Sequence, residues 1–135
     1  MMSLYSRFSP LTLRLVFGIL FLIHGVSKFN QMTVTEQFFT KIGLPAGVVP
    51  FVALIEIIGG ISLLIGYGSR IFAFILAIDM LVAIFVAKLS MGFVGGYEFE
   101  LSLIAGLVSI VLSGPGAFSL KSASSSRKVS GVTAK

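Results

Sequence analysis

Four long apolar stretches, separated by short polar connections, dominate the chain. They cover residues 11–29, 46–65, 71–89 and 97–113 and contain few charged side chains. A helix needs about 20 apolar residues to cross roughly 30 Å of hydrocarbon. The stretches lack the alternation of a barrel strand, and a helix pairs its backbone polar groups internally. The pattern predicts an all-α, polytopic membrane protein, an antiparallel bundle of four transmembrane helices.

The connections refine this architecture. Residues 66–69 are so few that the second and third stretches must form a tight antiparallel hairpin. The first connection is longer, and we expect it to hold a short helix that begins with a capping box of Thr33 and Glu36. Val34 and Phe38 share one face of it, so we expect an interfacial helix over the mouth of the bundle.

Composition excludes several classes of protein. Of the 135 residues 56% are hydrophobic and 11% charged, whereas a soluble domain carries roughly 25% charged residues. A domain this short cannot hide so much apolar surface from water, which excludes a soluble globule. The lack of cysteine excludes disulfides, iron–sulfur clusters and cysteine zinc sites, and the single His24 excludes bis-histidine haem ligation within one chain. We expect no metal site.

The ten basic residues predict the orientation. With four spans, seven fall on the side of the termini and three on the other, so both termini are expected in the cytoplasm. We take the net charge of +5 as a topology signal rather than a sign of nucleic-acid binding. Residues 1–120 are expected to form one membrane domain and the serine-rich residues 121–135 a disordered basic cytoplasmic tail. The seven are Arg7, Arg14, Arg70, Lys121, Arg127, Lys128 and Lys135, and the three are Lys28, Lys41 and Lys88.

Most of the acidic residues lie in or next to the apolar stretches, where a charge is unfavourable in free energy. Glu56 and Asp79 lie inside apolar stretches, and Glu98 and Glu100 open the last one. A charge at mid-membrane costs roughly 2.5–3.5 kcal/mol on an insertion scale, so Glu56 and Asp79 together would cost about 5–7 kcal/mol unpaired. We expect them to face the bundle interior, to find partners or to be protonated.

Depth along the helices suggests which groups meet. At about 1.5 Å per residue, His24 lies roughly 6 Å below the outer end of the first helix if that end is Lys28, and Glu56 lies roughly 9–15 Å below the same surface. These three residues are our candidate catalytic groups. Glu56 would give or take a proton, His24 would donate a hydrogen bond or carry a proton, and Lys28 would stabilise negative charge. The structural alternative is an interfacial anchor of His24 and Lys28 beside a protonated, hydrogen-bonded Glu56.

Other residues complete this picture. Glu98, Glu100 and Asp79 are candidate residues of a substrate pocket at the outer side, although a single contact between helices would also explain Asp79. Arg14 lies near the inner surface, where its side chain can reach the interface. Glycines in the first two stretches predict close helix packing, namely Gly18, Gly25, Gly59 and Gly60.

The order and spacing of several motifs resemble the DoxX family of small prokaryotic four-helix membrane proteins. The resemblance covers about residues 13–120. The motifs are Arg14-Leu15-Val16-Phe17-Gly18, His24-Gly25-Val26-Ser27-Lys28-Phe29, Gly43-Leu44-Pro45, Glu56-Ile57-Ile58-Gly59-Gly60, Gly66-Tyr67-Gly68-Ser69-Arg70, Gly96-Tyr97-Glu98, Gly114-Pro115-Gly116 and Ser119-Leu120.

The resemblance implies a protein of the prokaryotic cell membrane associated with redox chemistry. Family members are linked to quinol oxidase and thiosulfate-to-quinone systems and to resistance against oxidants, quinones and catechols, although their reaction is not established. It therefore implies an oxidoreductase role with a quinone as candidate cofactor or substrate. Because the chain has no visible redox centre, a redox partner protein or a bound cofactor would have to supply electrons.

Two other functions stay open. A non-enzymatic scaffold or assembly factor for a redox complex would explain the small size and the missing redox centre. A proton-coupled carrier of small aromatic molecules, with Glu56 as its proton site, would need more than four helices and hence a homo-oligomer, and the chain shows no inverted repeat.

Overall fold

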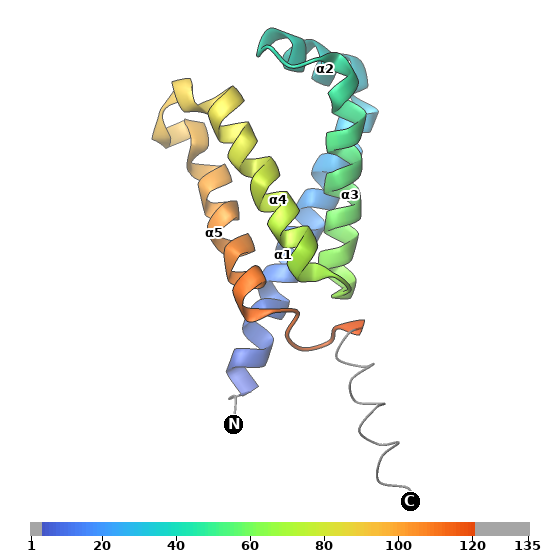
Figure 1. Cartoon of the computed structure of the whole chain (residues 1–135), viewed down its shortest axis with the longest axis vertical. Coiled ribbons are helices and arrows are strands. Elements are labelled where there is room, and N and C mark those ends of the chain that lie inside the picture. Colours follow the sequence, from blue (N-terminus) through green and yellow to red (C-terminus); the bar gives the residue numbers. More distant parts are fainter. Residues whose placement is uncertain (1–3, 121–135) are drawn as a thin grey trace, which may run out of the picture.

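The computed structural model describes residues 4–120, and within them every regular element is helical (Figure 1). The predicted basic tail, residues 121–135, lies outside the described part of the chain. The main helices are α1 (Leu4–Asn30), α2 (Met32–Lys41), α3 (Val49–Ile65), α4 (Ser69–Ala83) and α5 (Glu98–Ser113).

Four helical segments are long and apolar enough to cross a membrane, which confirms the predicted fold class. They are Leu4–Asn30, Ala46–Ile65, Ser69–Met91 and Phe93–Ser113. Short irregular turns lengthen three of them: η1 (Ala46–Val48) precedes α3, η2 (Ile84–Lys88) and η3 (Leu89–Met91) continue α4, and η4 (Phe93–Tyr97) leads into α5. The fourth span begins at Phe93, four residues before the stretch 97–113 that the sequence predicts.

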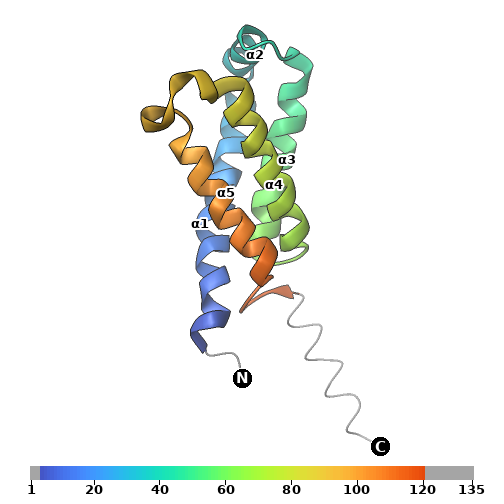
Figure 2. The ribbon, with the colours of Figure 1, turned by 60° about the vertical axis from the view of Figure 1, so that its left-hand side comes forward.

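The four long helices associate as two pairs. α1 packs most extensively along α3, and α4 along α5 (Figure 2). Figure 1 shows the α4–α5 pair leaning away from α3 towards the end of the bundle that carries α2. We call this the α2 end and the opposite one, where α1 begins and α5 finishes, the Arg14 end.

Glycines bring the backbones of α1 and α3 together, as the sequence predicts. A Cβ added at Gly25 would lie 2.7 Å from the Ala53 carbonyl oxygen, and one added at Gly60 would lie 2.7 Å from the Gly18 carbonyl oxygen. No side chain fits at such distances, so glycine at these positions sets how closely the two helices approach.

Large apolar side chains fill the centre of the bundle. Phe21 from α1 and Leu63 from α3 are fully buried against residues of α4 and α5. The buried positions of α5 repeat every three or four residues, which is the spacing of one helix face. This core separates the polar groups of the α2 end from those of the Arg14 end. Its other buried members are Ala73, Leu76, Met80, Leu103, Leu107 and Ile110.

The connections bear out one prediction and correct another. Residues 66–68 join α3 to α4 in a tight hairpin, in which Gly66 and Gly68 have φ angles of 74° and 62°. The first connection does hold a helix, α2, but the predicted capping box is wrong. The helix begins at Met32 after Gln31, and no side chain caps it. That α2 lies at a membrane interface stays a prediction.

Candidate functional site

A partly buried ion pair joins α1 to α3 near the α2 end. Lys28 Nζ donates to Glu56 Oε2 at 2.6 Å, and the two side chains are 21% and 2% exposed. Lys28 belongs to the face of α1 that also buries Phe21 and Gly25, and Glu56 stands one turn from Gly59 and Gly60 on the buried face of α3. The close glycine contact therefore brings lysine and glutamate within reach.

Asp79 adds a second carboxyl group to this pair. Its side chain comes from α4 and lies close enough to Glu56 and Lys28 for their charges to act on it. Asp79 Oδ2 is buried and meets no donor among the described residues. We call Lys28, Glu56 and Asp79 the carboxyl cluster.

A second ion pair joins the end of α4 to α5. Lys88, the last residue of η2, lies 3.0 Å from Glu100 Oε1, and Glu100 is 7% exposed. Glu100 Oε2 is buried and has no hydrogen-bond partner within residues 4–120. Both residues stand beside the same short connection between antiparallel helices, and that placement is the sequence signal from which the pair could have been predicted.

Two of the expected site residues, His24 and Glu98, make contacts outside the carboxyl cluster. His24 is exposed at the edge of α1, and its ring lies against Phe99 of α5 with centroids 6.2 Å apart. Glu98 accepts a hydrogen bond from Gly95 N at 2.8 Å and so stabilises the turn before α5. Neither is among the groups that contact Glu56 in the structure.

The physical reason is helix phase. His24 lies three residues after buried Phe21 and one before buried Gly25, so its side chain leaves α1 at the border of the buried face rather than within it. Likewise Glu100, not Glu98, occupies the buried face of α5. Depth alone indicated that these residues could meet, whereas the rotation of each helix decides which of them do.

Arg14 departs most clearly from expectation. It does not extend to an interface but is fully buried at the Arg14 end, where no carboxylate pairs with it among the described residues. Its guanidinium donates to backbone carbonyl oxygens at the end of α3 and in the segment after α5. The acceptors are Leu63 at 2.8 Å, Ala117 at 3.0 Å, Leu64 at 3.3 Å, Phe118 at 3.4 Å, and Pro115. The sequence signal is that Arg14, Gly18, Phe21, Gly25 and Lys28 share one face of α1.

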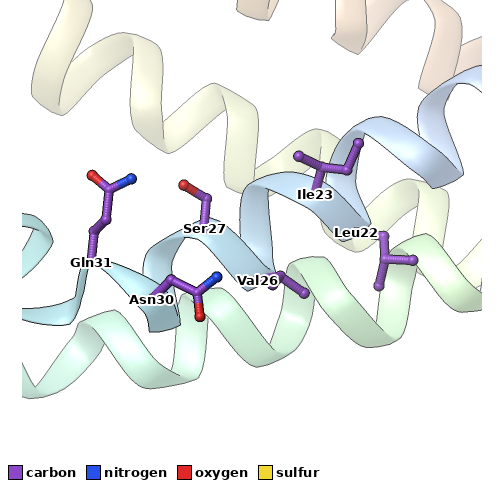
Figure 3. Close-up of a pocket in the computed structure, with 6 residues that line it drawn as sticks. All are labelled: Leu22, Ile23, Val26, Ser27, Asn30 and Gln31. Carbon is purple, nitrogen blue, oxygen red and sulfur yellow. The ribbon is translucent and has the colours of Figure 1, made fainter.

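Neither of the two cavities described here reaches the carboxyl cluster. One, of about 290 Å³, lies along the last two turns of α1 and is lined by Leu22, Ile23, Val26, Ser27, Asn30 and Gln31 (Figure 3). The other, of about 320 Å³, lies between α4 and α5 and has an entirely apolar lining. Glu56 itself is buried, whereas the side chain of Lys28 is 21% exposed.

No grouping of three or more His, Asp or Glu side chains suited to a metal ion occurs in residues 4–120. The carboxyl cluster instead brings two acids and one ammonium together in an apolar interior. Such a set can hold and transfer a proton and can stabilise a negative oxygen.

Comparison with known proteins gives a consistent result. A sequence model of the DoxX family matches residues 9–89. "Putative oxidoreductase CatD" of Bacillus subtilis (strain 168) is 39% identical over 104 residues, which cover 77% of this chain and 78% of that protein. No solved structure matches significantly.

Two further relatives are membrane proteins by name. "Uncharacterized membrane protein Rv3486" of Mycobacterium tuberculosis is 34% identical, with 83% of this chain and 78% of that protein covered. "Inner membrane protein YqjF" of Escherichia coli is 31% identical, with 82% and 87% covered.

Proposed function

Because this chain belongs to the DoxX family of membrane proteins, we propose that it is the membrane component of an oxidoreductase that acts on quinones or catechols. In this proposal the carboxyl cluster handles the protons of the reaction. Its relative in Bacillus subtilis carries the name of an oxidoreductase, which supports the reaction class.

The observation that carries the proposal is the carboxyl cluster itself. Glu56 is paired with the ammonium group of Lys28, and Asp79 lies close enough for both charges to act on it, on three helices whose other buried residues are mostly apolar. A contact that served only to hold helices together would not need two acids, because each buried charge is costly. Two carboxyl groups beside one ammonium can take up a proton and pass it to a bound ligand.

The reduction of a quinone to a quinol needs two electrons and two protons. The carboxyl cluster would donate one proton to a quinone oxygen, Lys28 would stabilise negative charge on that oxygen, and water at the α2 end would supply the second proton. The chain holds no cysteine and one histidine, so a redox partner protein would supply the electrons.

The same proposal gives the protein a place and an orientation. It would lie in the prokaryotic cell membrane with both termini in the cytoplasm, because Arg7, Arg14 and Arg70 fall at the Arg14 end of the bundle. The α2 end and the carboxyl cluster would then face the outer side.

Ligand titration tests the proposal. Purified protein is titrated with ubiquinone, menaquinone and catechol analogues, and the titration is repeated with Glu56→Gln and with Glu36→Gln as a control in α2. Loss of one charge-assisted hydrogen bond predicts roughly tenfold weaker binding for Glu56→Gln, whereas Glu36→Gln should bind as the parent does. No binding by the parent protein, or equal binding by Glu56→Gln, would refute the proposal.

One observation favours a second function, that of a scaffold for another membrane complex. Glu56 is 1% exposed, and the residues of the carboxyl cluster line neither of the two cavities. In a scaffold these residues would only hold helices together. Crosslinking in native membranes would then recover a stoichiometric partner, and oxidant resistance of the cells would survive replacement of both Glu56 and Asp79.

A further inference from the structure

Three arginines lie around one short segment at the Arg14 end of the bundle. The segment starts at Gly114, directly after α5, where a Cβ added to the glycine would lie 2.9 Å from the guanidinium of Arg70. It reaches Ala117, whose N donates to Arg7 O at 2.8 Å and whose O accepts from Arg14 at 3.0 Å. Figure 1 shows the start of α1, the α3–α4 hairpin and this segment at the same end of the bundle.

The two ends of the bundle differ in their balance of charge. The Arg14 end carries three arginines, and none of the five acidic side chains of the protein lies there. The α2 end carries three lysines, two of which are paired with Glu56 and Glu100. The α2 end thus supplies its own counter-charges, whereas the Arg14 end has none among residues 4–120. The three lysines are Lys28, Lys41 and Lys88.

The three arginines differ in how many of their donors are available. Every N–H group of the Arg14 guanidinium has a backbone carbonyl oxygen as acceptor. Arg7 and Arg70 are both exposed. Within residues 4–120, the one hydrogen bond printed for their guanidinium groups is the long one from Arg70 to Leu112 O, at 3.4 Å. Arg14 therefore contributes charge and holds the segment in place, while Arg7 and Arg70 can bind a ligand.

The residue types at this end indicate the chemistry of that ligand. A planar guanidinium can bind two oxygens of one phosphate at once, whereas an ammonium acts as a point charge. An exposed tyrosine stands close in sequence to each exposed arginine, because Tyr5 is 88% and Tyr67 66% exposed. Tyrosine is enriched where a membrane meets water, at the level of the lipid headgroups. A phosphate met at this depth belongs to a phospholipid, which favours lipid over a soluble acidic partner.

We propose that the Arg14 end is a docking surface for anionic phospholipids, whose headgroup phosphates bind Arg7 and Arg70. Arg14 acts as a positioning residue that holds the segment after α5 against α1 and α3. Three positive charges without a counter-charge attract a lipid of net negative charge more strongly than a zwitterionic lipid with the same phosphate. The surface does not include the carboxyl cluster, so it does not depend on the proposed function.

Native mass spectrometry of the full chain in a neutral detergent tests this surface. The protein is titrated with phosphatidylglycerol and, separately, with phosphatidylcholine of the same acyl chains, and the fraction of lipid-bound protein gives the affinity. Arg7→Gln, Arg70→Gln and the double variant are compared with the parent. Lys41→Gln removes an exposed cation at the α2 end and is the matched control. Circular dichroism at the helix band checks that each variant is folded.

We expect the parent to bind phosphatidylglycerol more tightly than phosphatidylcholine. Each arginine variant should weaken phosphatidylglycerol binding roughly fivefold, the effect of one basic residue at an anionic membrane surface, and the double variant about 25-fold. Lys41→Gln should bind as the parent does.

Three results would overturn the proposal. The first is equal affinity of the parent for the two lipids. The second is parental affinity in the double variant, which would assign the binding to the four basic residues of 121–135 instead. The third is a loss in Lys41→Gln as large as that in Arg70→Gln, which would show that any exposed cation of the chain has the same effect.

Discussion

Replacement of Arg14 by methionine should cost this protein much of its stability. The arginine side chain is fully buried and donates to carbonyl oxygens from two segments far apart in the chain. Methionine has a similar length but no donor, so the carbonyl oxygens of Leu63 and Ala117 would lose their partner. Buried acceptors without a donor are expensive to maintain.

The magnitude follows from the hydrogen bonds. Those to Leu63 at 2.8 Å and to Ala117 at 3.0 Å have normal lengths, and those to Leu64 and Phe118 are long. With about 1.5–2.5 kcal/mol for each of the two normal bonds from this charged donor, Arg14→Met should lower the free energy of unfolding by roughly 3–5 kcal/mol. Arg14→Lys should lose less, because lysine keeps the charge but lacks the planar fork.

Unfolding by SDS in mixed micelles, followed by circular dichroism at the helix band, measures this loss. The chain has no tryptophan, which rules out tryptophan fluorescence as the probe. Arg70→Met is the matched control, since Arg70 is exposed at the same end and makes one long hydrogen bond to Leu112. It should change stability by less than about 0.5 kcal/mol. Equal stability of Arg14→Met and Arg70→Met would refute the reasoning.

Two further predictions concern packing and the second ion pair. Gly25→Ala should destabilise by about 1–3 kcal/mol because the added Cβ would meet Ile57 at 2.6 Å; Gly47→Ala, with open space around it, should be neutral in the same unfolding assay. Lys88→Met should cost about 1–3 kcal/mol by leaving the Glu100 carboxylate unpaired, and Lys88→Met with Glu100→Leu should recover most of it. A double variant no more stable than Lys88→Met would show that the ion pair is not the cause, and Lys41→Met on exposed α2 serves as the control.

The sequence predicts the glycine contact because its requirements are local. Gly18 and Gly25 lie seven residues apart, and seven residues return nearly to the same face of a helix. The sequence of α1 alone shows that this face carries no bulky side chains at the two glycines, so it predicts that another helix packs closely there. The sequence also predicted part of the carboxyl cluster for the same reason, since charged residues inside apolar helices must turn inward.

Which side chains pair with each other could not be predicted from one helix at a time. Glu98 and Glu100 are two residues apart at the same depth, yet one binds its own turn and the other binds Lys88. A rotation of about 200° between the two positions separates an interior side chain from one at the edge. Which of the two positions points into the bundle is fixed by how α5 packs on α4, and a single sequence does not specify it.

The sequence by itself determined that this protein has four spans suited to a membrane and that acidic side chains lie in its interior. Hydropathy and the free-energy cost of buried charge act on each helix separately. Only the tertiary structure decided that Glu56 lies between Lys28 and Asp79, that His24 remains outside this cluster, and that Arg14 is buried against carbonyl oxygens. These outcomes depend on the mutual rotation and tilt of helices, and many weak contacts spread over the whole bundle set both.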